Sequence, residues 1–168
     1  MRLSVPSAWV LCVLTMACNR PTAPTAPQPV TGANVETITL EAEAGVGQGD
    51  LQQRSRASGG STIHLAPGQR RQWTFNSAVQ SSRYAIFVTY SNDNPGDTEE
   101  LRVEIDGQPI GAFHAQDTGD DGEGWNLFVA DRAGASMLHA GTHVLTLESI
   151  GGDGCIEIDV LTLRPGDS

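Results

Sequence analysis

The chain has 168 residues, a formal net charge of −10 and a sequence pI of about 4.6, and all ten of its basic residues are arginine. An acidic chain without a basic stripe argues against a nucleic-acid-binding surface and against binding to an anionic membrane. The 19 glycines and 9 prolines, set against 5% aromatic residues, predict many turns and short strands rather than long helices.

Residues 1–18 are predicted to be a signal peptide. They begin with a positive charge at Arg2, continue through an apolar centre and end near the small Ala17. The segment is too short to span a membrane as a mature helix. Its last five residues resemble the lipobox of bacterial lipoproteins, in which Cys18 would become the lipidated first residue. Thr15 stands where that motif usually has leucine, so plain secretion is the alternative to a lipid-anchored protein of the bacterial cell envelope.

Residues 19–34 are predicted to be a linker. Their repeated proline favours extended polyproline II and prevents a packed core, as is typical of a tether. The folded domain is expected over residues 35–164, with a short tail at 165–168. Cys155 is the one cysteine inside this domain, so no internal disulfide framework is predicted.

The first predicted strand covers residues 37–43. Side chains alternate between the two faces of a strand, so Glu41 and Glu43 are expected on one face and the apolar residues on the other. Two carboxylates this close repel each other unless a positive charge lies between them. Two interpretations stay open: both side chains point into water, or they hold a hard cation such as calcium.

Further strands are predicted along the rest of the domain, separated by turns rich in glycine. Residues 83–91 have apolar side chains on both faces, which predicts burial on both, whereas 101–105 alternate and predict one wet face. The other expected strands cover residues 62–65, 71–75, 110–114, 125–130, 136–138, 143–149 and 155–163. This pattern predicts an all-β fold, an antiparallel β-sandwich or jelly roll, in which the first and last strands are often neighbours.

Several short motifs follow one another in a distinctive order. They are Glu41-Ala42-Glu43, Gly59-Gly60-Ser61, Tyr90-Ser91-Asn92, Asp106-Gly107-Gln108, Gly124-Trp125-Asn126, Ala140-Gly141-Thr142-His143 and Ile158-Asp159-Val160-Leu161. In this order they resemble the carbohydrate-binding modules of families 6 and 35, which are β-sandwiches of the galactose-binding-like type. The resemblance implies a structural calcium held by Glu41, Glu43 and Asp159, a set of oxygen donors that calcium prefers.

The same resemblance implies a saccharide site at the loop edge of the sandwich. Trp125 matches the aromatic platform of the family, and Tyr90, Asn92, Asn126 and Asp93 are the candidate neighbours. The alternatives are that Trp125 and Tyr90 belong to the core and that Asn92 only shapes a turn.

One position departs from the family pattern. Members often carry asparagine two residues before the final aspartate, where this chain has Glu157, and this puts the class of sugar in doubt.

The sequence contains no recognisable catalytic constellation, so the chain is not expected to be an enzyme. The function it favours is a non-catalytic module that binds a polysaccharide or glycan, with membrane contact only through a lipid anchor. The alternative is a structural or adhesive surface lipoprotein whose sugar site has degenerated.

Overall fold

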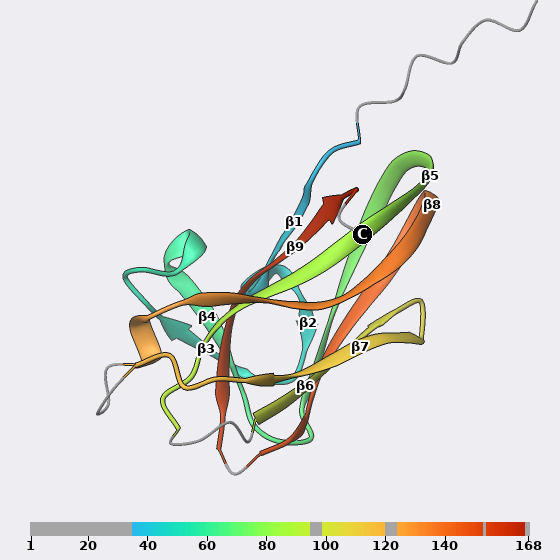
Figure 1. Ribbon diagram of the computed structural model, residues 1–168. Coiled ribbons are helices and arrows are strands. Elements are labelled where there is room, and N and C mark those ends of the chain that lie inside the picture. Colours follow the sequence, from blue (N-terminus) through green and yellow to red (C-terminus); the bar gives the residue numbers. More distant parts are fainter. Residues whose placement is uncertain (1–34, 95–98, 120–123, 153, 167–168) are drawn as a thin grey trace, which may run out of the picture. The chain divides into compact units, whose positions relative to one another are not determined.

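The computed structural model describes residues 35–94, 99–119, 124–152 and 154–166, which form strands joined by short 3-10 turns (Figure 1). The predicted signal peptide and linker, including Cys18, lie outside these residues. No helix in the described part of the chain is long and apolar enough to cross a membrane. The elements are β1 (Ile38–Glu41), η1 (Ala42–Ala44), β2 (Val46–Gly47), β3 (Asp50–Gln53), η2 (Ser58–Gly60), β4 (Ser61–Leu65), β5 (Arg70–Ser91), β6 (Glu99–Ile105), β7 (Gln108–Ala115), η3 (Gly124–Asn126), β8 (Val129–Gly151) and β9 (Ile156–Pro165).

Two long strands form the frame of the fold. β5 has 22 residues and β8 has 23, and the two pair antiparallel along nearly their whole length. Their register shifts between Ser77 and Ser81, and there the paired ribbon folds over on itself (Figure 1). Each strand therefore contributes one half to each of two packed layers.

The hydrogen-bonded order β3-β4-β9-β5-β8-β6-β7 runs through both layers. One layer contains β3, β4, β9, the second half of β5 and the first half of β8, with β1 beside β9. The other contains β2, the first half of β5, the second half of β8, β6 and β7. All of these pairings are antiparallel, which confirms the predicted β-sandwich.

The core lies between the layers and follows the alternation of the strands. Tyr84, Ile86, Val88 and Tyr90 of β5 are 2% exposed or less, because every second side chain of a strand points to the same face. Leu145 and Leu147 of β8 are fully buried in the same cluster. The predicted burial of residues 83–91 on both faces holds only in part, because on the other face Ala85 is buried but Phe87 and Thr89 are partly exposed.

Two glycines allow the backbones of β7 and β8 to lie very close together. A Cβ atom on Gly111 of β7 would lie 1.9 Å from the carbonyl oxygen of Ala133, and one on Gly134 of β8 would lie 2.5 Å from that of Ile110. Such distances are far below van der Waals contact, so only glycine permits the two backbones to approach this closely.

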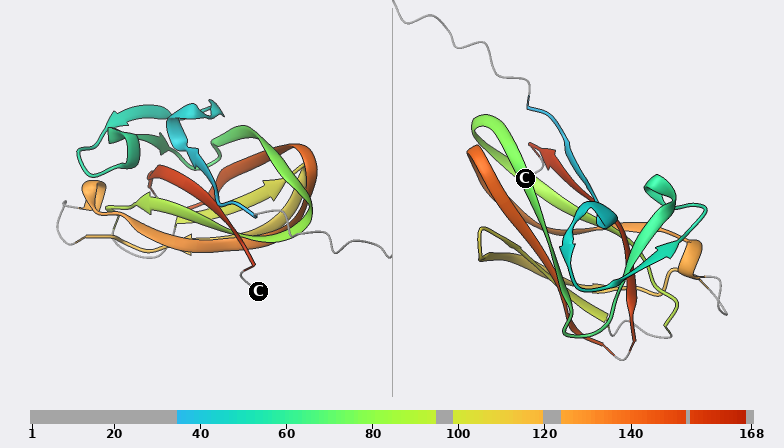
Figure 2. Two further views of the ribbon diagram at one scale, coloured as in Figure 1. Left: turned by 90° about the horizontal axis from the view of Figure 1, so that it is seen from above. Right: turned by 180° about the vertical axis from the view of Figure 1, so that it is seen from behind.

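The structure differs from the sequence-based boundaries at several points. The first strand ends at Glu41 and the chain turns into η1, so Glu43 is not on the same strand face as Glu41. Residues 71–75 and 83–91 belong to one strand, as do 136–138 and 143–149, because bulges carry the ladder through the fold-over. Trp125 lies in η3, and the strand predicted from residue 125 begins at Val129. β1 and β9 lie side by side, as predicted (Figure 2).

A histidine–aspartate pair ties the β6–β7 turn to β8. His143 Nδ1 lies 2.7 Å from Asp106 Oδ2, and His143 Nε2 lies 2.9 Å from the carbonyl oxygen of His139. Both neighbours are acceptors, so the doubly protonated ring satisfies both. Burial alone would lower the pKa of His143, but these two hydrogen bonds outweigh it and raise the pKa. Burial likewise opposes, but does not cancel, the lowering of the pKa of Asp106 by its hydrogen bonds with His143 and the Val144 N–H.

The pair is expected to make folding stability depend on pH. The contribution of His143 is fully present below its unfolded pKa near 6.5 and is lost as the pH rises through the higher folded pKa. The contribution of Asp106 is present above 3.8 and is lost as the pH falls through the lower folded pKa. Urea unfolding should therefore show that His143→Gln costs most between these limits, by less than about 1 kcal/mol. A loss that is independent of pH would contradict this assignment.

Candidate functional site

The three predicted metal ligands lie around one small region beside β9. Glu41 Oε2, Glu43 Oε2 and Asp159 Oδ1 are buried and have no hydrogen-bond partner. Burial raises the pKa of Asp159 to about 6; the Ser58 N–H, which hydrogen-bonds to this carboxylate, opposes the rise, and the charges of Glu41 and Glu43 add to it. Three unpartnered carboxylate oxygens, one from each side chain, thus face a region from which water is largely excluded.

The backbone around these carboxylates is held by two side chains of β5. Arg71 is buried and donates to the carbonyl oxygens of Ala42, Glu43, Gly45 and Gln48 at 2.6–3.3 Å. Trp73 Nε1 donates to the carbonyl oxygen of Glu41 at 2.8 Å. These bonds satisfy carbonyl groups of the segment in which the chain leaves the ladder after Glu41.

The loop of residues 54–60 covers the carboxylates from the other side. Ser58 Oγ donates to Glu41 Oε1 at 2.9 Å. Gly59 has a φ of +65°, and a Cβ atom there would lie 2.7 Å from Glu43 Oε1. Glycine therefore gives the carboxylate of Glu43 room that any other residue would fill.

The donor set of this region fits calcium. Carboxylate oxygens are the ligands that calcium takes, and a divalent cation would offset the mutual repulsion of the buried Asp159 and the partly buried Glu41 and Glu43. Within the described ranges, no group of three or more His, Cys, Asp or Glu side chains is placed so that it could hold a metal ion as the structure stands. The unpartnered oxygens, and not a closed coordination shell, are therefore the observation that supports a cation here.

Trp125 lies at the end of the sandwich where η2 and η3 meet. Its side chain is partly exposed and is not among the buried core residues. The indole packs on the ring of His64, with the ring centroids 5.3 Å apart and the planes at 54°. His64 comes from β4 and lies opposite Glu157 of β9 in the register. Trp125 is thus an aromatic side chain at a loop edge, supported from below by a strand.

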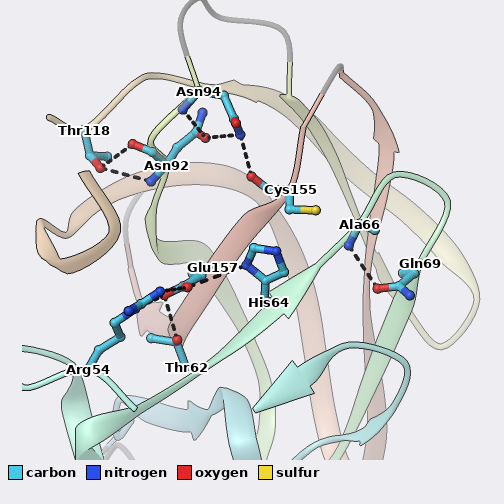
Figure 3. Close-up of polar contacts among 10 residues, drawn as sticks. All are labelled: Arg54, Thr62, His64, Ala66, Gln69, Asn92, Asn94, Thr118, Cys155 and Glu157. Atoms are coloured by element: carbon cyan, nitrogen blue, oxygen red, sulfur yellow. Dashed lines mark hydrogen bonds and ion pairs between the residues drawn. The ribbon is translucent and has the colours of Figure 1, made fainter. Parts of the chain in front are cut away.

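Beside His64 is an ion pair whose carboxylate is buried (Figure 3). Glu157 is 0% exposed and accepts two parallel hydrogen bonds from the guanidinium of Arg54, one of them 2.7 Å from Nε. Thr62 Oγ1 donates to Glu157 at 2.9 Å, and His64 Nδ1 lies 3.6 Å from its other oxygen. The hydrogen bonds to Glu157 raise the pKa of Arg54. Glu157 therefore neutralises Arg54 instead of facing solvent.

Asn126 and Asp93 hold loops in place. Asn126 Oδ1 accepts from the Arg56 N–H at 3.1 Å, and its Nδ2 donates to Ser55 Oγ at 3.0 Å. Asp93 Oδ1 accepts from the Gly124 N–H at 3.3 Å, at the start of η3. Both side chains fix the position of Trp125.

Tyr90 and Asn92 lie in the interior. Both are 0% exposed. The hydroxyl of Tyr90 donates to Asp131 at 2.6 Å, and Asn92 Nδ2 donates to Glu99 at 2.8 Å. Asn92 Oδ1 also accepts from Asn94, as Figure 3 shows. Neither side chain presents a surface to a ligand, and neither is part of the function proposed below.

A groove of about 370 Å³ borders η3 and is lined by Asp117, Thr118, Gly119 and Leu127. Its volume is within the range of sites for small ligands. A smaller hollow of about 210 Å³ lies near the fold-over of β5. The aromatic residue of that hollow, Tyr84, is only 2% exposed, so it offers no platform for stacking.

Three residues that contribute to the site, Arg54, His64 and Arg71, were not found from the sequence. Arg54 and Glu157 are 103 positions apart, and no motif marks them as partners. His64 has no partner motif either. Arg71 was expected only as a strand residue, and the four carbonyl oxygens that it binds around the Glu41–Glu43 region leave no signal in the sequence.

Comparisons with known proteins support the fold. No family model matches the chain, and no curated protein matches it. A family 35 carbohydrate-binding module from Clostridium thermocellum is 20% identical with a TM-score of 0.65, over 76% of this chain and 97% of that chain. The C-terminal CBM6 of LamC, a laminarinase from Zobellia galactanivorans, is 18% identical with a TM-score of 0.64, over 77% and 99%.

A GH26-CBM35 β-(1,4)-mannanase from Podospora anserina is 19% identical with a TM-score of 0.63, and the match covers 79% of this chain but only 28% of that one. The present chain is therefore similar to a part of that enzyme. Together these likenesses show that the chain has the β-sandwich fold of family 6 and family 35 carbohydrate-binding modules, as its sequence motifs predicted.

Proposed function

We propose that the protein is a non-catalytic carbohydrate-binding module that holds a saccharide against Trp125. The observation that carries this proposal is the position of Trp125, partly exposed at the loop end and packed on His64. An indole of this kind buries the apolar face of a pyranose ring, and nearby polar groups fix the hydroxyls. The solved modules of the same fold are named as carbohydrate-binding, and this supports the proposal.

We propose that polar side chains at the same end of the sandwich bind the sugar hydroxyls. Arg54 is 28% exposed and uses Nε and one terminal nitrogen for Glu157, which leaves N–H groups on the other terminal nitrogen for a ligand. The side chains of Asp117 and Thr118 line the adjacent groove. Because Glu157 neutralises Arg54, we expect the site to favour neutral saccharides over anionic ones.

We further propose that Glu41, Glu43 and Asp159 hold a structural calcium. The ion would compensate their negative charge and fix the loops that carry them. The hydrogen bonds from Arg71 and Trp73 to backbone carbonyl groups would hold the surrounding chain in place. Secretion, or attachment to a bacterial envelope through Cys18, is the location that we propose from the sequence of the N-terminal segment.

Removing the platform is expected to weaken saccharide binding. Trp125→Ala should raise the Kd for the best-binding polysaccharide about 30-fold, the equivalent of about 2 kcal/mol for the loss of one central aromatic contact. Affinity electrophoresis against a panel of neutral and anionic polysaccharides, followed by calorimetry, measures the change. Met137→Ala is the control, because Met137 is also an exposed apolar side chain but lies far along β8. An equal effect of the two substitutions would contradict the site.

A second candidate function rests on one observation. Glu157 and Arg54 bind each other, and both ends of the Asn126 amide are used by the loop of residues 54–60. A site in which most of these polar groups already bind each other suits a structural or adhesive module without a saccharide. In that case Trp125→Ala lowers the melting temperature, and none of the polysaccharides in the panel binds the wild type.

A further inference from the structure

We infer that the loop of residues 54–60 couples cation binding at Glu41, Glu43 and Asp159 to the position of Trp125. The inference rests on the proposed function and adds a regulatory link within it. The loop contacts both regions through different residues, so a displacement at one end has a physical route to the other.

At the cation end, the loop binds two of the three carboxylates directly. Ser58 Oγ donates to Glu41 Oε1 at 2.9 Å, and the Ser58 N–H hydrogen-bonds to Asp159. Gly59 lies against Glu43 and leaves no room for a side chain between them. When a cation draws the carboxylates together, Ser58 and Gly59 must move with them or lose these contacts.

At the other end, the loop binds the turn that carries Trp125. The Arg56 N–H donates to Asn126 Oδ1 at 3.1 Å, and Asn126 Nδ2 donates to Ser55 Oγ at 3.0 Å. Asn126 follows Trp125 directly in η3. Figures 1 and 2 show the loop and η3 at the same end of the sandwich in each view. Asn126 is therefore a positioning residue for the indole.

The loop between these contacts is a compact unit. The Ala57 N–H donates to the carbonyl oxygen of Arg54 at 3.2 Å, and the Gly60 N–H donates to that of Ala57 at 3.0 Å. The Arg54 N–H closes the loop by donating to the carbonyl oxygen of Gly60 at 3.0 Å. These bonds make the loop move as one body, so it passes a shift at Ser58 on to Ser55 and Arg56.

Coupling of this kind is reciprocal. If calcium tightens saccharide binding by some factor, the saccharide tightens calcium binding by the same factor. We expect a factor of about 5 or more, at the low end of typical coupling between sites. Without the Asn126 contacts, the factor should fall towards one.

The experiment is fluorine NMR of the full chain labelled with fluorotryptophan and titrated with calcium. The three tryptophans are assigned with Trp9→Phe and Trp125→Phe. Trp73 serves as an internal reporter of the cation site, because its indole N–H is bonded to the carbonyl of Glu41. In the wild type both the Trp73 and the Trp125 resonances should shift with the same midpoint. In Asn126→Ala the Trp73 shift should persist and the Trp125 shift should be lost.

The controls separate this inference from the proposed function. Asn76→Ala removes an exposed amide that is bonded to Thr142 and should leave both shifts intact. If Trp125 follows calcium equally in Asn126→Ala, the coupling inference fails while the cation site stands. If Trp73 does not respond to calcium in the wild type, the cation site and the coupling both fail, while saccharide binding to Trp125 is still measured on its own.

Discussion

Arg54→Ala should lower the free energy of unfolding by about 3 kcal/mol. The substitution leaves the carboxylate of Glu157, which is 0% exposed, without its two charge-assisted hydrogen bonds, and an unpaired buried charge costs about 3–5 kcal/mol. We choose the lower end because Arg54 itself is partly exposed. Urea unfolding monitored by circular dichroism measures the loss.

A second arginine–carboxylate pair provides a matched control. Arg102 donates to Glu148 at 2.7 Å, but both side chains are more exposed, and such surface pairs contribute little to stability. Adding Glu157→Gln to Arg54→Ala should recover part of the stability, because it removes the stranded charge. Equal losses for Arg54→Ala and Arg102→Ala would show that the Glu157 pair is no more important than a surface contact.

Calcium should raise the melting temperature of the wild type by about 10 °C at 100 times its Kd. Mass action contributes about 2.7 kcal/mol at that ratio, and a domain of this size shifts by a few degrees for each kcal/mol. Asp159→Asn should abolish the increase. In the presence of a chelator the same variant should be more stable than the wild type, because it removes a carboxylate whose burial, together with repulsion from Glu41 and Glu43, raises the pKa of Asp159 to about 6.

Asp50→Asn is the control for this second prediction, since Asp50 is an exposed carboxylate on β3. It should leave both the melting temperature and the response to calcium unchanged. Scanning calorimetry with calcium and with a chelator provides the comparison. The cation site would be excluded if the melting temperature of the wild type did not change with calcium. It would also be excluded if Asp159→Asn were destabilised both with calcium and with a chelator.

The fold was predictable because it depends on local alternation. The apolar side chains of 84, 86, 88 and 90 repeat with period two, and the structure buries all four. The neighbouring positions of β1 and β9 followed from the sandwich architecture itself. The continuity of β5 and β8 through the fold-over did not follow, because the bulges that allow it have no strong sequence signal.

The candidate site was predictable only in part. The motifs located Glu41, Glu43, Asp159 and Trp125, because a carboxylate or an indole indicates by its own chemistry what it could bind. The same motifs also pointed to Tyr90, although its place in the apolar alternation already indicated the core, where the structure has it. The pairing of Arg54 with Glu157 depends on which segments meet in space, and a single sequence does not contain that information.

The fold-over of β5 and β8 also bears on how the domain gains and loses its structure. Since β5 and β8 belong to both layers, neither layer can lose these two strands without disrupting the other layer. Hydrogen exchange should therefore protect the centres of both layers to one common limit, set by global unfolding. Pairing the start of β5 with the end of β8 also requires closing a long loop of chain, so we expect this domain to refold slowly for its size.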